Sequence, residues 1–428
     1  MSSQNYEVTT LGNGLKVVTV PMQERESAAV AIWVRTGGRY ESKKVSGVSH
    51  FLEHMLFKGT KKRTTRQIKE DIEGVGGMLN AFTGEEATCY FAKLLVRHFP
   101  KAIDVLSDMT NHATLEAAEI AKERTVILEE IKMYRDLPSH HVYDLMGELL
   151  WPGQPLGRPV SGTIETVSGL TRTELTGYKK KFYHPKNIIV TVSGPVNHEK
   201  TVEQVRESFP EKSRLPVSKF AKAFSGQSGP RTHFVEKQTE QTHFVIGMRS
   251  FSRFHPDRYK LGLLNIILGA NMSSRLFEEV REKRGLAYEI KSGVGFYHDT
   301  GSVSISAGVE AGKAPEAVRV ILHELEKLRR KGINEGELRR AKDYFMSQLY
   351  MGIEDTLDHL LWVGERALDG ELPDRENIRQ EIESVKRSDL QDIARNLFVN
   401  RGLNFALIGP LPPKVQRRIQ EDFEIHER

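Results

Sequence analysis

Two histidines and a glutamate stand close together in the first half of this chain. Residues 50–54 read His-Phe-Leu-Glu-His, which places His50 and His54 four positions apart with Glu53 between them. On a helix, side chains at this spacing share one face. Two neutral imidazoles are suitable ligands for Zn²⁺, and a carboxylate beside them can take a proton from a metal-bound water. The pattern therefore predicts a zinc site with a general base next to it.

The residues around this motif favour a helix over about 46–57. Gly47 and Ser49 precede the motif, apolar side chains fill the positions between its polar residues, and Gly59 follows as a helix stop. Two other interpretations are a chance match and a pair of core histidines held by a glutamate. The second is unfavourable, because a buried cluster of charged groups without a metal is costly.

A catalytic zinc site needs a third protein ligand and one open position. Glu123 and Glu130 are seven positions apart, about two helical turns, and so point the same way, whereas Glu129 points elsewhere. His140 and His141 are rival donors. Spacing alone leaves this choice open, because most glutamates on helices are solvated surface charges.

Composition excludes several other classes of protein. A length of 428 residues predicts two domains. The net charge of +5, from 62 basic and 57 acidic residues, is too small and too dispersed to indicate a nucleic-acid partner. The single Cys89 rules out an intrachain disulfide and fits a reducing compartment. Residues 1–10 are polar, without the apolar core of a signal peptide, and no stretch is apolar enough to span a membrane. We therefore expect a cytoplasmic protein with no membrane association.

The order of strand and helix signals repeats about halfway along the chain. Residues 189–195, Ile-Val-Thr-Val-Ser-Gly-Pro, resemble residues 404–410, Asn-Phe-Ala-Leu-Ile-Gly-Pro, and each stretch leads into a short charged helix. Between the halves, residues 210–230 are rich in proline, glycine and serine. A repeat of this length indicates a duplicated domain.

The expected elements follow from period and turn signals. In the first half we expect strands over 6–10 and 15–20 around an Asn-Gly turn, and further strands over 28–34, 79–82, 88–95 and 188–192, with helices from 65, over 97–151 and over 199–209. In the second half we expect strands over 232–237, 242–248, 301–308 and 404–410, with helices over 257–268 and 313–398.

These signals predict an α+β fold of two homologous domains, each a mainly antiparallel sheet packed with helices. The boundaries are 1–209 for the zinc-binding domain, 210–230 for the linker and 231–428 for the second domain. Residues 261–267, where the metal helix should recur, contain neither histidine nor glutamate. Only the first copy is therefore expected to bind metal, which gives one zinc per chain.

Several motifs occur in the order found in one known family. Residues 47–60 carry the zinc motif followed by Phe-Lys-Gly-Thr, and the later matches are residues 76–83, 123–131, 156–159 and 276–288. With these motifs the chain resembles the pitrilysin/insulysin family of inverzincin peptidases, and most of all its short-chain branch, which includes the mitochondrial processing peptidase. The resemblance covers nearly the whole chain.

The resemblance implies a role for each residue of the zinc motif. His50, His54 and Glu130 match the zinc ligands of the family, which resolves the choice in favour of Glu130. Glu53 matches the general base, and Glu123 matches a carboxylate that supports the site from behind the ligands.

The resemblance also implies how substrate is held. Asn80, Ala81, Phe82 and Thr83 match an edge strand that receives the substrate backbone in extended form. On sequence alone Asn80 is equally consistent with a turn residue after the Gly-Gly pair at 76–77. Further residues come from the second half.

Arg281 and Tyr288 match an Arg/Tyr pair of the family that binds substrate carbonyls and steadies the oxyanion. Because the long-chain relatives use four repeats and this chain has two, the resemblance further implies a homodimer in which each site is completed by the other subunit.

The implied function is that of a zinc metalloendopeptidase acting on peptides or unfolded polypeptides. Two alternatives belong to other classes. Relatives with this fold serve as non-catalytic scaffold subunits, but those lack ligands that are present here. A small lyase shares the zinc motif, but it is far shorter and has no second half.

Overall fold

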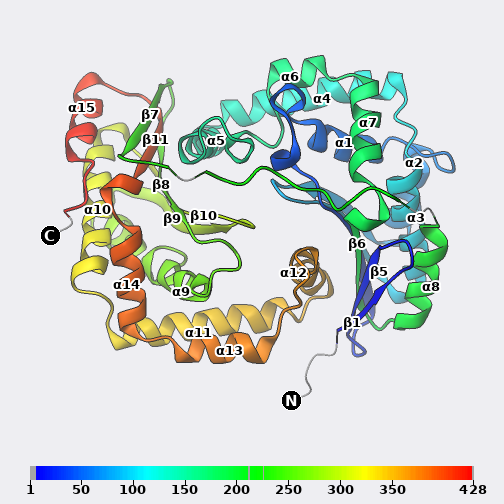
Figure 1. The fold of residues 1–428 in the computed structure, drawn as a ribbon. Helices are drawn as coiled ribbons and strands as arrows, with labels where there is room; N and C mark the ends of the chain where they lie inside the picture. Colours follow the sequence, from blue (N-terminus) through cyan, green and yellow to red (C-terminus); the bar gives the residue numbers. More distant parts are fainter. Residues whose placement is uncertain (1–5, 211–212, 225, 427–428) are drawn as a thin grey trace. The chain divides into compact units, whose positions relative to one another are not determined.

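The computed structural model describes residues 6–210, 213–224 and 226–426, and the chain folds into two compact units (Figure 1). The first unit comprises residues up to 131, 159–221 and 349–374, and the second comprises 132–158, 222–348 and 375 onward. Helix α5 (Pro138–Leu150) therefore belongs to the second unit, although it lies in the first half of the sequence. Helix α12 (Thr356–Leu368) comes from the second half and belongs to the first unit.

The first unit is built on a six-stranded sheet in the order β1-β2-β6-β3-β5-β4. Neighbouring strands are antiparallel except β2 and β6, which are parallel. The strands are β1 (Glu7–Thr10), β2 (Lys16–Pro21), β3 (Ser27–Val34), β4 (Met78–Thr83), β5 (Thr88–Leu95) and β6 (Ile188–Gly194). Runs of valine, isoleucine and threonine explain the buried central strands, since β-branched side chains pack well on a pleated surface.

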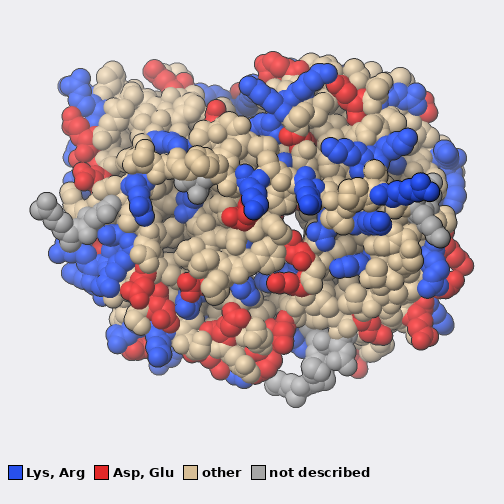
Figure 2. Space-filling view, in the orientation of Figure 1, with Lys and Arg blue, Asp and Glu red and all other residues tan. Residues whose placement is uncertain are grey.

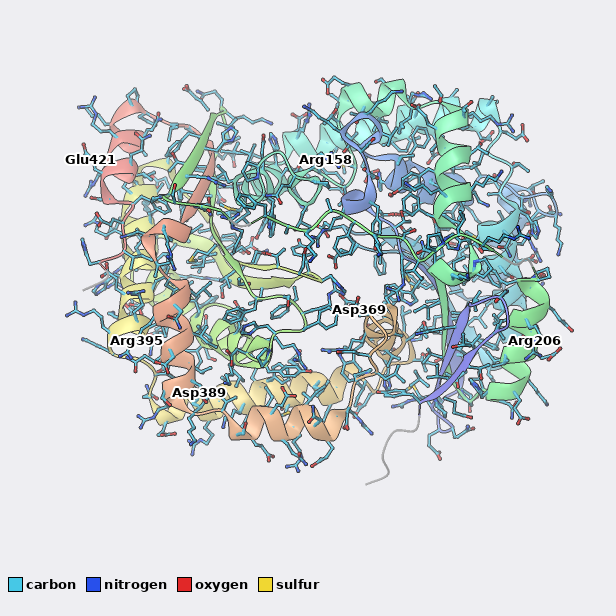
Figure 3. All side chains as sticks on the ribbon, in the orientation of Figure 1. Arg158, Arg206, Asp369, Asp389, Arg395 and Glu421 are labelled. Carbon is cyan, nitrogen blue, oxygen red and sulfur yellow. The ribbon has the colours of Figure 1, made fainter. Side chains whose placement is uncertain are left out.

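Helices cover both faces of this sheet. One face packs against α1, α3, α7 and α8 through a large apolar core, and the other packs against α12 through a smaller core that includes Trp33 and Val363. Side chains fill the space between α12 and the strands (Figure 3). The helices of the unit besides α12 are α1 (Val48–Leu56), α2 (Thr65–Ile72), α3 (Phe99–His112), α4 (Ala117–Asp136, whose last turn falls in the second unit), α6 (Ile164–Gly169), α7 (Arg172–Phe182) and α8 (His198–Ser208).

The second unit contains a five-stranded sheet in the order β7-β11-β8-β10-β9. Its strands are β7 (Arg231–Glu236), β8 (Thr242–Ser250), β9 (Ala287–Phe296), β10 (Gly301–Val309) and β11 (Asn404–Gly409). Its helices, besides α5, are α9 (Arg258–Leu268), α10 (Ala314–Arg330), α11 (Glu335–Gly352, whose end falls in the first unit), α13 (Arg375–Ser384), α14 (Arg387–Leu397) and α15 (Pro413–Asp422). A short π-helix, η7 (Phe277–Glu282), precedes β9.

Apart from the additional edge strand β1 of the first sheet, the two sheets share one topology, which confirms the predicted α+β fold. In each sheet a parallel pair, β2/β6 or β7/β11, is followed by three antiparallel neighbours, and the last strand in the order, β4 or β9, is an edge. The strand β6 corresponds to β11, as the matching of residues 189–195 with 404–410 predicts.

Three elements were not foreseen from the sequence. Strand β9 contains two glycines and two charged residues, which are poor strand formers, and helices α6 and α7 are short. Both helices nevertheless begin with a capping box, at Thr163 and Thr171, which is a readable signal.

The proposed domain boundaries remain a prediction. Some positions lie outside the described residues: 1–5 and 427–428 in the two domains, and 211–212 and 225 in the linker. The described part of 210–230 contains neither helix nor strand. No helix of the described chain is both long and apolar enough to cross a membrane.

Candidate metal centre

Helix α1 is fixed at its N-terminus by a buried carboxylate. Glu41 accepts hydrogen bonds from the backbone N–H groups of Gly47, at 2.7 Å, and Ser49, at 2.8 Å. These N–H groups have no partner inside the helix, and a negative charge at this end is favourable. Gly47 has a φ of 91°, a conformation that favours glycine. The start of α1, and with it the position of the motif, is therefore well defined.

The amphipathic pattern of α1 sets the direction of the motif. The apolar residues Phe51, Leu52 and Met55 are buried in the core of the first unit. His50 and His54 occupy another face and are only partly buried, with side-chain exposures of 14% and 21%. The four-residue spacing thus brings both imidazoles to the same side of the helix, as predicted.

Glu130 on α4 meets the two histidines. Its Oε1 lies 3.8 Å from His50 Nε2, and its Oε2 lies 3.6 Å from His54 Nε2. These separations are too long for hydrogen bonds. They are close to the roughly 3.3–3.6 Å expected between ligand atoms that each lie about 2.0–2.2 Å from a tetrahedral zinc ion. The three residues form the one group of this kind among the described residues, with all ligand atoms within 4.8 Å of one another.

The protonation of His50 suits metal binding. Burial, followed by the nearby His54, lowers the pKa of His50 to about 4. The imidazole is therefore neutral at pH 7 and has a lone pair for a metal. Both the geometry and the donor chemistry of the cluster fit zinc, with two imidazole nitrogens and one carboxylate.

Glu123 supports His54 from behind. Its Oε1 accepts a hydrogen bond from His54 Nδ1 at 2.9 Å, which leaves Nε2 directed towards Glu130, and its Oε2 pairs with Lys58 Nζ at 2.6 Å. Burial alone would raise the pKa of Glu123, but the hydrogen bonds from His54 and Lys58 outweigh it and lower the pKa. Burial would likewise lower the pKa of His54, but Glu123 and the nearby carboxylates raise it.

Glu53 lies on the same helix but has different surroundings. Burial raises the pKa of its carboxyl, and a hydrogen bond from Thr83 opposes that shift. Thr83 Oγ1 donates to Glu53 Oε2 at 2.5 Å. A raised pKa is suitable for a group that accepts and returns a proton near neutral pH.

The predicted substrate strand is β4, and it is an edge of the first sheet. Its residues alternate: Ala81 packs against the core beneath α1, whereas Phe82 lies on the other face, edge-on to Trp33 at a centroid distance of 5.7 Å. The side chain of Asn80 accepts a hydrogen bond from the backbone N–H of Ala81 at 2.8 Å. Asn80 pairs with Phe91 of β5, so it is part of the strand rather than of a turn.

The remaining predicted residues belong to the second unit. Arg281 lies on η7 and Tyr288 on β9, with the guanidinium carbon 5.3 Å from the centroid of the phenol ring. Tyr288 is 77% exposed. The rival donors His140 and His141 lie on α5, outside the metal cluster.

Sequence reasoning missed two residues of the centre. Lys58, which holds Glu123, stands four positions after His54, and that spacing is a usable signal on a helix or its C-terminal turn. Glu41 stands six positions before the helix cap it supports, so only its acidic character hinted at its role.

Fold and site together define a class: a duplicated α+β protein in which, among the residues that the structure describes, only the first copy carries a His-His-Glu cluster of zinc-ligand type. The profile of the insulinase family (peptidase family M16) matches residues 16–164, and that of the peptidase M16 inactive domain matches residues 169–345. The chain belongs to peptidase family M16, as the sequence motifs indicated.

Relatives and solved structures agree with this assignment. An uncharacterized zinc protease of Streptomyces coelicolor is 36% identical over 96% of this chain and 91% of its own length. The uncharacterized zinc protease YmxG of Bacillus subtilis is 35% identical over 94% of this chain and 97% of its own length. The crystal structure of a protease from Helicobacter pylori is similar with a TM-score of 0.89 and 25% identity, covering 96% of this chain and all of that one. Membership of a zinc protease family thus supports zinc as the metal and a peptidase role.

Proposed function

We propose that this chain is a zinc-dependent endopeptidase that hydrolyses peptides or unfolded polypeptides bound in extended form. The observation that carries the proposal is the complete His50, His54 and Glu130 cluster with Glu53 on the same helix. A non-catalytic scaffold would not need this combination of ligands and base. Zinc, when bound, would polarise the scissile carbonyl and acidify the attacking water.

The residues of the chain then have separate tasks. Glu53 takes a proton from the attacking water and returns it to the amine of the leaving peptide. Glu123, held by Lys58, keeps His54 in the tautomer that directs Nε2 to the metal. Tyr288 and Arg281 bind substrate carbonyls and steady the oxyanion.

The edge strand β4 provides for binding in extended form. A peptide added to a sheet edge is held by main-chain hydrogen bonds, so binding tolerates many sequences but requires an unfolded segment. We therefore expect an unfolded protein to be cleaved much faster than its folded form. Equal rates for the two forms would contradict this mode of binding.

The decisive experiment treats a mixed peptide library with the zinc-loaded protein and identifies the products by mass spectrometry. Cleavage that stops with a chelator and returns with zinc is the expected result. A protein that retains full zinc and cleaves no peptide would instead be a scaffold. Release of products other than peptides would indicate a different zinc chemistry.

A homodimer with two-fold symmetry is the assembly we propose, with each active site completed by Tyr288 and Arg281 of the other subunit. Mixing inactive Glu53→Gln with inactive Tyr288→Phe protein tests this arrangement. A mixed dimer would place both changes in one site and leave the other intact, so activity should recover to at most half. No recovery despite proven subunit exchange would exclude sites shared between subunits.

A cytoplasmic location also remains a proposal, supported by the single Cys89. Cell fractionation tests it.

The charge distribution bears on partners as well. Basic and acidic side chains are interspersed over the part of the first unit visible in Figure 2, and we propose peptide rather than nucleic acid as the partner.

A further inference from the structure

Strand β4 directs alternate side chains to opposite faces of the first sheet. Leu79 and Ala81 pack against the core beneath α1, whereas Phe82 packs on the face that carries Trp33. Thr83 follows the period of Leu79 and Ala81 and therefore faces α1. Its hydroxyl thereby reaches a residue of the zinc motif, although the two are 30 positions apart in sequence.

The contact is short and its direction is defined. Thr83 Oγ1 donates to Glu53 Oε2 at 2.5 Å, in the range of a hydrogen bond from a hydroxyl to a carboxylate. Thr88, opposite Thr83 in the β4/β5 register, lies 3.4 Å from the same hydroxyl and donates to the carbonyl of Thr36 at 3.2 Å. A threonine hydroxyl has only one proton, so the short contact commits that proton to Glu53.

The backbone of Thr83 has a different orientation from its side chain. The N–H of Gly84 donates to the carbonyl of Ala87 at 2.9 Å, so Gly84 and Ala87 form a hydrogen-bonded pair next to the Thr83–Thr88 pair. In an antiparallel ladder such pairs alternate with pairs whose N–H and C=O groups point away from each other. The backbone groups of Thr83 and Ala81 therefore point to the free edge. The bond from Ala81 N–H to the side chain of Asn80 agrees with this orientation.

We propose that Thr83 is a positioning residue, which orients the general base Glu53 relative to a peptide bound on β4. This inference rests on the proposed peptidase function. One residue offers its backbone to the substrate strand and its hydroxyl to the base. Because threonine is branched at Cβ, its side chain is stiff, and the strand sets the place of the hydroxyl. Holding Oε2 fixes the flexible glutamate and leaves Oε1 for the water.

The test compares Thr83→Val, which keeps the shape but removes the hydroxyl, with Thr83→Ser, which keeps the hydroxyl. Thr88→Val is the matched control, because Thr88 lies in the same hairpin and its hydroxyl contacts Thr36 and Thr83 rather than Glu53. For a peptide substrate we expect Thr83→Val to lower kcat about 10- to 100-fold, because misplacing a catalytic group by about 1 Å can cost 100-fold. KM and zinc content should stay within about twofold of wild type, and Thr83→Ser should recover most of kcat.

A double variant separates positioning from a general structural effect. Once Glu53 is glutamine, adding Thr83→Val should change the residual rate less than about twofold, because the group that Thr83 positions is already gone. An unchanged kcat in Thr83→Val, a raised KM with normal kcat, or additive losses in the double variant would each overturn the proposal.

Crystal structures of the zinc-loaded variants test the inference independently of turnover. Glu53 should lose its ordered position in Thr83→Val and keep it in Thr83→Ser and Thr88→Val. An undisturbed Glu53 in Thr83→Val would overturn the inference even in a protein without peptidase activity. Conversely, a wild-type protein that cleaves nothing would refute the proposed function and leave the structural comparison valid.

Discussion

The two units have the same order of five strands but carry different helices in corresponding places. Helix α1 follows β3 in the first unit, and α9 follows β8 in the second. Helix α1 presents His50, Glu53 and His54 beside its buried apolar face, whereas α9 contains no histidine or glutamate and buries four leucines and one isoleucine. The shared strand order alone therefore does not make a metal-binding cluster. That cluster depends on a few polar residues of α1, together with Glu130 on α4.

The units also treat buried carboxylates in different ways. In the first unit Glu123 lies between His54 and Lys58, and these hydrogen bonds lower its pKa. In the second unit burial raises the pKa of Asp144 on α5 to about 6, against the opposing charges of Arg135 and His140. Glu123 therefore stays ionised to lower pH than an ordinary glutamate, whereas Asp144 keeps its proton to higher pH than an ordinary aspartate.

The largest effect should come from removing a ligand in the first unit. We expect His54→Ala to reduce bound zinc from one ion per chain to none and to abolish peptidase activity, because the described residues of the second unit contain no second group of possible ligands. Metal analysis after zinc loading and dialysis provides the measurement. A wild-type chain with two zinc ions, or a variant that keeps one, would show that the second unit also binds metal.

The next effect separates binding from chemistry on α1. Glu53→Gln should keep one zinc per chain and lower kcat by about 100- to 10,000-fold, since an amide cannot accept the proton of the water. Zinc content and kcat measured on the same preparation decide the matter. If the variant retained substantial turnover, another group would be the base.

A smaller effect concerns the residue behind His54. Replacing Glu123 by glutamine should weaken zinc affinity by about 10- to 100-fold, as the loss of a partner of a metal-bound histidine does. Glu129→Gln is the matched control, because Glu129 is exposed on the same helix. Competition with a chelator of known affinity gives the constants. Equal affinities for the two variants would mean that Glu123 does not support the site.

Particular residues show how much of the candidate metal site can be predicted from the sequence. The spacing of His50, Glu53 and His54 was enough to predict a helix with a metal-binding face, because helical geometry is local. Spacing could not distinguish Glu123 from Glu130, since both face the same way. In the fold, Glu130 lies near both Nε2 atoms and Glu123 binds Nδ1 of His54.

Contacts that depend on tertiary structure could not be predicted from the sequence. The bond from Thr83 to Glu53 joins a strand and a helix whose relation no local pattern specifies. Strand β9 was missed because its glycines and charges hide the alternation of an edge strand. By contrast, the buried strands β3 and β6 were visible from their β-branched runs, since packing there demands such residues.

The smallest effect tests the second unit by itself. The pKa of Asp144 is about 6 in the fold, above its ordinary value of 3.8, so the folded state keeps a proton that the unfolded state has released between those pH values. The free energy of unfolding therefore falls as pH rises from about 4 to 6 and is not lowered further above that range.

The variant Asp144→Asn removes this loss of stability, because its side chain carries no charge at any of these pH values. Because solvent partly reaches the side chain, we expect the variant to be more stable than wild type by about 1 kcal/mol at pH 8. At about pH 4 the difference should vanish. Urea unfolding across this range measures it, with Glu148→Gln, an exposed change on the same helix, as control. A gain that did not depend on pH would show that Asp144 destabilises the fold through its shape and not through its charge.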